Sequence, residues 1–157
     1  MERLKWKLEN GKWKGERMSI NEIQDEIIDE FSLFDDWMER YQLIVEYANE
    51  LKKHPMPAAD KTEQNLIDGC QSKVWFTARL EDGKIIFNGD SDALLVKGIV
   101  ALLIRVLSGH TPKEIMDANL YFIDDIQLRE HLSPTRNNGV VAMLKQLKLY
   151  ALAYANG

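Results

Sequence analysis

The chain is organised around one stretch, residues 65–76, which reads Asn65-Leu66-Ile67-Asp68-Gly69-Cys70-Gln71-Ser72-Lys73-Val74-Trp75-Phe76. Gly69 can adopt backbone angles that are closed to other residues, so a sharp bend directly before Cys70 forms easily. The run that starts at Val74 is apolar and β-prone, which predicts the start of a strand. The only cysteine of the protein is therefore predicted to lie at a loop tip on a rigid support, where functional residues are often presented.

Two interpretations of Cys70 follow from its surroundings. Free cysteine is among the most frequently buried residue types, and most lone cysteines are small core hydrophobes. The sequence neighbours of Cys70 are polar, however, from Asp68 to Lys73, and this favours an accessible thiol. Lys73 is a candidate for lowering the pKa of that thiol, and only the thiolate is nucleophilic. The local sequence leaves both interpretations open.

The residues after Cys70 predict a β-hairpin and then a buried helix. Residues 74–80 and 85–87 are β-prone and flank a turn at Asp82-Gly83, which is a strong hairpin signal. Residues 88–92 form an acidic turn without the spacing of an EF-hand, so we expect Ser91 or Asp92 to cap the next helix. That helix, residues 93–103, is apolar nearly all round and is expected to be the central buried element.

Helices are also predicted on both sides of this centre. Ser19 followed by Glu22 is a capping box, and the apolar residues after it recur at helical spacing. We expect the acidic face of this first helix, which includes Glu26 and Glu30, to be a solvated surface. A second helix is predicted to end before Pro55. The remaining predicted helices begin at Thr111-Pro112, lie within residues 120–132, and follow a polar turn at residues 133–139.

These elements predict an α+β fold in which a small antiparallel sheet packs against helices in one compact domain. A length of 157 residues suits a single domain with its own core. Residues 1–17 differ from the rest, because they are rich in Lys, Gly and Trp and show no sustained period. We interpret them as a leader or tail that is mobile or packs through Trp6 and Trp13, and residues 18–157 as the folded domain.

Composition excludes several classes of function. A net charge of −5 without a basic stripe argues against nucleic-acid binding. One cysteine supplies neither an internal disulfide nor a multi-thiolate zinc or iron–sulfur site. The most apolar run, residues 93–107, is too short and too charged to span a bilayer, and the first residues lack the apolar block of a signal peptide. We expect a cytoplasmic protein that binds no metal, no cofactor of its own and no membrane.

Two kinds of side chain are candidates for chemistry beside Cys70. His54, His110 and His131 are possible bases for a cysteine-dependent hydrolase, but no protease-like signature surrounds the cysteine, so we rank this alternative low. Arg136 lies in a polar turn; it is either a surface residue at a helix end or a partner for an anion or thiolate, because its guanidinium stays charged and offers fixed donors.

Three motifs in one order resemble the signature of the SufE-like family of sulfur acceptors. They are Gly69-Cys70-Gln71-Ser72-Lys73-Val74-Trp75, Gly89-Asp90-Ser91-Asp92-Ala93-Leu94-Leu95-Val96-Lys97-Gly98 and His131-Leu132-Ser133-Pro134-Thr135-Arg136-Asn137-Asn138-Gly139. Thr111-Pro112 also matches, and the resemblance covers residues 19–157. It implies a fold similar to that of the NifU/IscU-like iron–sulfur scaffold proteins.

The resemblance also implies a function. A SufS-like cysteine desulfurase, which uses pyridoxal phosphate, would give persulfide sulfur to Cys70 and be stimulated by this chain, and the sulfur would pass to a SufBCD-like scaffold complex. Arg136 would pair with the thiolate or persulfide or contact the partner. The implied partner-binding residues are Gly69, Gln71, Ser72, Asp90 and Asp92. Since the chain has one cysteine where a scaffold needs several ligands, a carrier is favoured; the main alternative is a module that activates a desulfurase without carrying sulfur.

Overall fold

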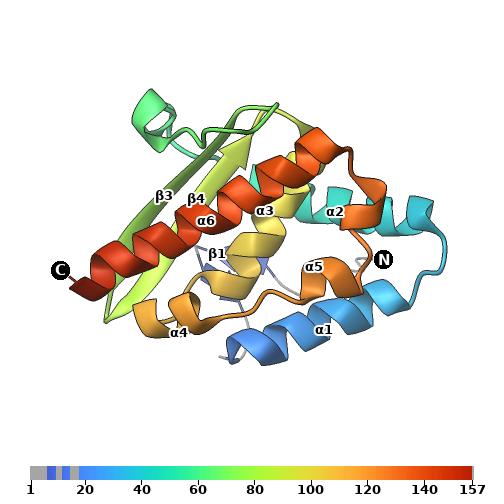
Figure 1. The fold of residues 1–157 in the computed structure, drawn as a ribbon, viewed down its shortest axis with the longest axis horizontal. Coiled ribbons are helices and arrows are strands. Elements are labelled where there is room, and N and C mark those ends of the chain that lie inside the picture. The colour runs from blue at the N-terminus through green and yellow to red at the C-terminus, as the bar shows by residue number, and fades with distance from the viewer. Residues whose placement is uncertain (1–6, 10–11, 15–17, 157) are drawn as a thin grey trace.

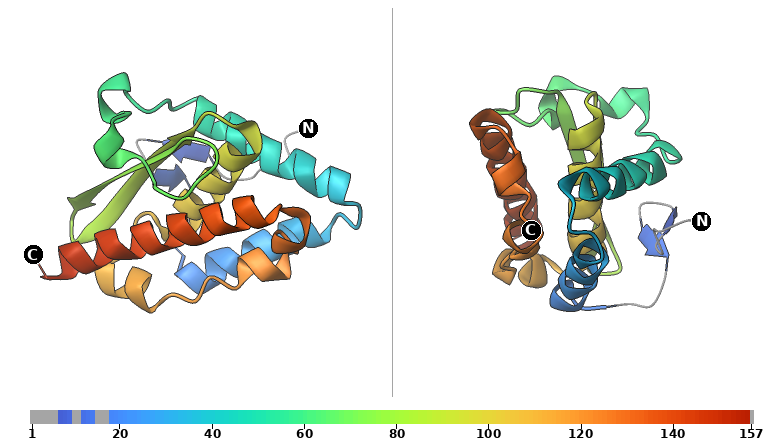
Figure 2. Two further views of the ribbon diagram at one scale, coloured as in Figure 1. Left: turned by 45° about the horizontal axis from the view of Figure 1, so that its top comes forward. Right: turned by 90° about the vertical axis from the view of Figure 1, so that its right-hand side faces the viewer.

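The structure is a computed structural model, which describes residues 7–9 and 12–14 by their backbone and residues 18–156 in full. A β-hairpin and the helix α3 (Leu94–Leu107) form its centre, with the long helix α6 (Pro134–Asn156) along one side (Figure 1). The helix α2 (Trp37–Lys52) lies on the other side of α3, as the right-hand view of Figure 2 shows. This arrangement confirms the predicted α+β architecture.

The hairpin consists of β3 (Val74–Glu81) and β4 (Lys84–Ser91), paired antiparallel from Glu81↔Lys84 to Val74↔Ser91. Asp82 and Gly83 have φ angles of 52° and 77°, and a two-residue hairpin turn with both φ angles positive matches the twist of the strands. The predicted hairpin is confirmed, and β4 extends further than predicted. Its register places the end of β4 beside the start of β3, so the Asp90 motif lies next to the Cys70 motif.

The first two helices begin where the sequence predicts. In α1 (Ile20–Ser32), Ser19 Oγ accepts a hydrogen bond from Glu22 N at 3.1 Å, and the Glu22 carboxylate accepts one from Ser19 N at 3.0 Å. These two bonds confirm the capping box. The helix α2 is capped by Asp36, which accepts a hydrogen bond from Met38 N at 3.1 Å.

The acidic face of α1 is not simply solvated, which corrects the prediction. Arg105, buried on α3, donates to Glu30 at 2.8 Å, to Glu26 at 3.0 Å and to the Tyr47 hydroxyl. Tyr47 in turn donates to Glu30 at 2.7 Å. The guanidinium can satisfy several acceptors at once, so this one side chain joins α1, α2 and α3 inside the core.

The helix α3 is buried along most of its length and is the predicted central element. Its N-cap is Ala93, and no side chain caps it. The prediction that Ser91 or Asp92 caps this helix is wrong, because β4 continues through Ser91. Ser91 Oγ accepts a hydrogen bond only from the N-cap residue itself, Ala93 N at 3.3 Å, and the Ser91 and Asp92 side chains both bond to Lys73.

The C-terminal half contains short helices and then α6. The helix α4 (Pro112–Asp117) starts with the capping box Thr111–Glu114 and with proline at its first position, as predicted. It is followed by α5 (Phe122–Asp125) and a 3-10 turn at Arg129–His131, and two further 3-10 turns, Ala58–Asp60 and Glu63–Asn65, lie between α2 and the Cys70 segment.

Residues 133–139 are not the predicted turn. Pro134 is the first residue of α6, a position that suits its fixed φ. Ser133 Oγ accepts a hydrogen bond from Arg136 N at 3.2 Å and so caps the helix. As a consequence, Arg136 lies in the first turn of α6 and Gly139 lies inside the helix.

The N-terminal segment contains a strand pair that the sequence analysis missed. β1 (Lys7–Glu9) pairs antiparallel with β2 (Lys12–Lys14). The missed signal is Asn10-Gly11 between them, the dipeptide most typical of a two-residue hairpin turn. The predictions that residues 1–17 are mobile and that Trp6 and Trp13 pack on the surface lie outside what the structure describes. Within the described ranges, no helix has both the length and the apolar character that a membrane span requires.

Candidate functional site

Cys70 lies on a short loop that is closed at its base. Ile67 N donates to Val74 O at 2.8 Å, and Gly69, with φ at +90°, makes the predicted bend. The cysteine is half-buried. Its Sγ lies 3.6 Å from the main-chain oxygen of Gly139 on α6, so the loop tip rests against that helix.

A small cavity of about 10 Å³, here named the thiol cavity, lies between this loop and α6. The apolar side chains of its lining come from β3, α3 and α6; they are Val74, Val96, Ile99, Val140 and Met143. Cys70 and Arg136, the two candidates for chemistry, also line it. The volume is about that of one water-sized sphere. Two motifs far apart in the sequence therefore meet at one site.

Arg136, which lines the thiol cavity, has an unpaired hydrogen-bond donor. Its Nη1 is buried and has no hydrogen-bond partner among the described residues. A buried donor without a partner is unfavourable, and the cost is larger for a charged group. An anion within reach of Nη1 would satisfy this donor.

Burial raises the pKa of the Cys70 thiol. The resting thiol is therefore mostly protonated at neutral pH and weakly nucleophilic. Lys73 was a candidate for lowering this pKa, but its side chain is exposed, and burial of the thiol sets the direction of the pKa shift. A thiol in this state has to lose its proton before it can act as a nucleophile.

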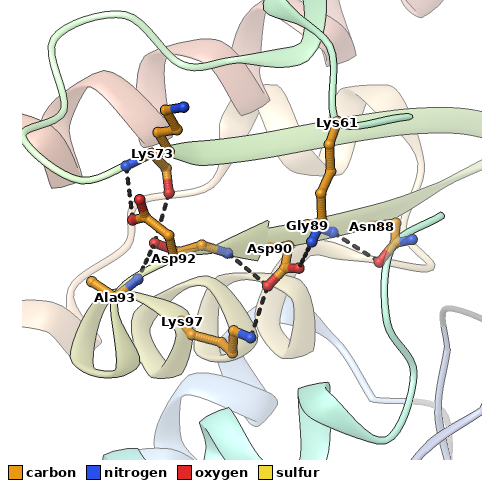
Figure 3. Close-up of polar contacts among 9 residues, drawn as sticks. Lys61, Lys73, Asn88, Gly89, Asp90, Asp92, Ala93 and Lys97 are labelled. Carbon is orange, nitrogen blue, oxygen red and sulfur yellow. Dashed lines mark hydrogen bonds and ion pairs between the residues drawn. The ribbon is translucent and has the colours of Figure 1, made fainter. Parts of the chain in front are cut away.

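Asp90 forms the centre of an ion cluster beside the loop (Figure 3). Its carboxylate lies 2.9 Å from Lys61 Nζ and 3.1 Å from Lys97 Nζ, and it accepts a hydrogen bond from Ser91 N at 2.7 Å. Burial alone would raise the pKa of Asp90, but the hydrogen bonds from the two lysines lower it on balance. Asp90 is itself buried, which argues against the expected contact with a partner. Its two ion pairs instead join β4 to Lys61, in the segment before Cys70, and to Lys97 on α3.

The neighbours of Asp90 hold the other end of the Cys70 loop. Asp92 accepts a hydrogen bond from Lys73 N at 3.0 Å (Figure 3). Ser91 Oγ donates to Lys73 O at 2.8 Å. These contacts fix the point at which the loop enters β3. Exposure differs among the remaining candidates for partner contact: Gly69, Gln71 and Asp92 are exposed, and Ser72 is partly buried.

None of the three histidines is placed to act as a base for Cys70. His110 is buried, with its Nε2 2.8 Å from the main-chain oxygen of Met18. His131 stacks on Trp37 with ring centroids 3.9 Å apart, and His54 lies beside a carboxylate of α2. They are all absent from the lining of the thiol cavity, so the hydrolase alternative lacks its base. Among the described residues, no cluster of His, Cys, Asp and Glu side chains could hold a metal ion.

Comparison with known proteins identifies the family. Residues 25–151 match the family model described as SufE, Fe-S metabolism associated domain. The chain belongs to the SufE family. An uncharacterized SufE-like protein of Synechocystis sp. is 41% identical over 131 residues, which cover 83% of this chain and 81% of that protein. An uncharacterized SufE-like protein of Rhizobium meliloti is 38% identical over 130 residues, 79% of this chain and 91% of that one.

A solved structure shows the same fold. The solution structure of a hypothetical protein from Thermus thermophilus superposes with a TM-score of 0.70 and covers 86% of this chain and 97% of its own. Its sequence identity of 24% supports a shared fold alone. The family membership connects the chain with iron–sulfur metabolism.

Sequence reasoning missed part of the site of this SufE-family chain. Val96 and Ile99 on α3, with Val140 and Met143 on α6, form apolar walls of the thiol cavity. Helical periodicity marked α3 and Val140 as core but gave no reason to place them beside the cysteine. Gly139 was quoted only as the end of a motif, and a glycine inside a helix is itself a signal of close packing.

Proposed function

We propose that Cys70 accepts sulfane sulfur from a cysteine desulfurase and carries it as a persulfide to an iron–sulfur scaffold complex. Membership of the SufE family supports a role in iron–sulfur metabolism. The observation that carries the proposal is that Cys70 and Arg136, whose buried Nη1 has no partner among the described residues, line one small cavity. A single thiol with a nearby cationic donor suits a carrier of one anionic sulfur group.

The transfer is a thiol–persulfide exchange. The Cys70 thiolate attacks the terminal sulfur of the desulfurase persulfide; a new S–S bond forms, the donor S–S bond breaks, and the donor cysteine leaves as a thiolate. In the second transfer a thiolate of the acceptor attacks the terminal sulfur on Cys70 and releases the Cys70 thiolate. Electrons balance in both steps without an added oxidant or reductant.

Arg136 acts on the charged forms of this sulfur. Its guanidinium keeps its charge and supplies directional donors, so it stabilises the Cys70 thiolate and the persulfide anion relative to the protonated forms. Because burial raises the pKa of the resting thiol, docking with the desulfurase has to promote deprotonation. During docking, the two ends of the Cys70 loop stay in place, held by the hydrogen bonds of Val74 O with Ile67 N and of Lys73 N with Asp92, while the tip at Cys70 moves away from α6.

The proposed partners are a SufS-like desulfurase, which uses pyridoxal phosphate, and a SufBCD-like scaffold complex. The proposed contacts are the exposed Gly69 and Gln71 and the partly buried Ser72 on the Cys70 loop, and the exposed Asp92, which bonds to Lys73 N at the end of that loop. We also propose that the chain stimulates the desulfurase, binds no cofactor of its own, acts in the cytoplasm, and has a fold related to that of the NifU/IscU-like scaffolds.

A sulfur-chase experiment tests the proposal. The protein is loaded by the desulfurase with cysteine that carries labelled sulfur, re-isolated, and mixed with the scaffold complex without further cysteine. We expect the label to leave Cys70 and appear on the scaffold. Label that stays on the protein, or that never binds to it while desulfurase activity rises, would contradict a carrier role and favour an activator.

A further inference from the structure

We infer that Tyr150 and Tyr154 hold α6 at one position along β3 and thereby place this helix against the Cys70 loop. Both tyrosines are positioning residues, because they are absent from the lining of the thiol cavity and act on the thiol through the helix. The consequence for sulfur transfer rests on the proposed function, whereas the positioning itself concerns the protein without a partner.

The outer edge of β3 is the first observation. In an antiparallel pair, every second residue of a strand directs its backbone groups away from the partner strand. Three such carbonyl oxygens follow one another on β3, and each accepts a hydrogen bond from outside the hairpin. The bonds are Ile67 N to Val74 O at 2.8 Å, the Tyr150 hydroxyl to Phe76 O at 3.1 Å, and the Tyr154 hydroxyl to Ala78 O at 3.0 Å. The same strand edge therefore holds the base of the Cys70 loop and the C-terminal half of α6.

The spacing of the two tyrosines matches that of their acceptors. Four residues along an α-helix span about 6.0 Å, and two residues along a strand span about 6.6–6.8 Å. Both hydroxyls therefore reach β3 together when α6 runs in the direction of the strand at this position. If α6 moved along its axis by one turn, about 5.4 Å, at most one tyrosine would still face Phe76 O or Ala78 O.

The other contacts of this half of α6 specify its position less sharply. Its buried apolar side chains recur every three or four residues, at Val140, Met143, Leu147 and Ala151. Apolar burial is non-directional, so neighbouring turns of the helix offer similar surfaces, whereas a hydrogen bond depends on distance and angle. Lys148 donates to Ala118 O at 2.6 Å, but its long stem is flexible. The half-buried tyrosines, whose rings pack against the core, supply the more rigid directional contacts.

The position of α6 decides the surroundings of Cys70, because the helix contributes one side of the thiol cavity. The main-chain oxygen of Gly139 lies 3.6 Å from Cys70 Sγ, and Arg136 and Met143 line the cavity. A shift of α6 separates these groups from the loop and lets water reach the thiol. It also removes part of the burial that raises the pKa of Cys70, so the thiol ionises more readily.

The test measures alkylation of Cys70 by iodoacetamide over a range of pH, without a partner, in three proteins. They are the wild type, the double variant Tyr150→Phe/Tyr154→Phe, and the control Tyr121→Phe, which loses a hydroxyl that donates to Asp25 on α1 at 2.7 Å. Phenylalanine keeps the ring, so all three should fold. In the double variant we expect alkylation at neutral pH to be about fivefold faster, the factor by which loss of one hydrogen bond shifts an equilibrium, and its midpoint to lie at lower pH. The control should match the wild type.

The outcomes separate this inference from the proposed function. A double variant with the rate and midpoint of the wild type would overturn the inference, as would an equal change in Tyr121→Phe, which would indicate a general loss of stability. If the double variant does not fold, Tyr150→Phe and Tyr154→Phe are measured singly, and wild-type values in both overturn it. Either result leaves the carrier function standing, whereas a wild type that gains no sulfur from a desulfurase refutes that function and leaves the positioning of α6 intact.

Discussion

Replacement of Asp90 by asparagine tests whether this residue stabilises the Cys70 region or contacts a partner. Asparagine keeps the shape of the side chain and removes the charge that holds Lys61 at 2.9 Å and Lys97 at 3.1 Å. We expect Asp90→Asn to unfold more easily than the wild type and to bind the desulfurase with nearly unchanged affinity once folded.

The size of the effect follows from the exposure of the lysines. Removing one partner of a fully buried ion pair costs about 3–5 kcal/mol. Here the Lys61 side chain is 36% exposed and that of Lys97 18% exposed, against 9% for Asp90, so both ammonium groups regain water in the variant. We therefore expect a loss of about 1–3 kcal/mol, between the values for exposed and buried pairs. For a chain of this length that is a decrease in Tm of roughly 3–9 °C.

The assay is urea unfolding of Asp90→Asn, of Asp29→Asn as a control at an exposed position of α1, and of the wild type over a range of pH. Because the pKa of Asp90 is lowered in the fold, its contribution is complete above the ordinary carboxyl pKa of about 3.9 and is lost as the pH falls through the lowered value. The difference between wild type and Asp90→Asn should therefore shrink in acid. Unchanged stability with weaker desulfurase binding would refute this reasoning and restore Asp90 to the docking surface.

Three further predictions concern Arg136, the thiol and the N-terminus. Arg136→Ala should fold normally and slow sulfur acceptance at least about tenfold, the effect expected when a charged hydrogen bond is lost, and Arg136→Lys should restore part of it; equal loading rates in a single-turnover assay would return Arg136 to a surface role. The rate of alkylation of Cys70 by iodoacetamide should rise with pH around a midpoint above that of a free cysteine, because burial raises the pKa of this thiol; a midpoint at or below the free value contradicts the shielded resting state. Removal of residues 1–17 should preserve folding and sulfur acceptance, since the family match begins at residue 25; calorimetry that shows a large loss of stability would disprove it.

Local signals in the sequence predicted local structure well. Asp82-Gly83 gave the hairpin, and Ser19 with Glu22 gave the start of α1, because a tight turn and a capping box depend on neighbouring residues alone. Asn10-Gly11 is a signal of the same kind that was overlooked. Arg136 was placed in a turn because its motif is polar, although Ser133-Pro134 is a normal start for a helix.

Contacts between distant segments could not be predicted from local sequence signals. The pairing of Val74 with Ser91 is what brings the acidic motif to the Cys70 loop, and this register depends on the whole hairpin. The thiol cavity depends on how α6 lies against the loop, which no local pattern encodes. For the same reason Ser91 or Asp92 was expected to cap α3, whereas both side chains bond to Lys73.

The central claim is that Cys70 carries the sulfur, and intact mass spectrometry of the wild type and Cys70→Ser after incubation with desulfurase and cysteine tests it most directly. Serine nearly preserves the size of the side chain, but its hydroxyl cannot hold sulfane sulfur, so the fold and the desulfurase complex should survive. The account predicts added sulfur on the wild type, none on Cys70→Ser, and a loss of desulfurase stimulation in the variant. A wild type without added sulfur, together with a Cys70→Ser protein that stimulates the desulfurase fully, would contradict it.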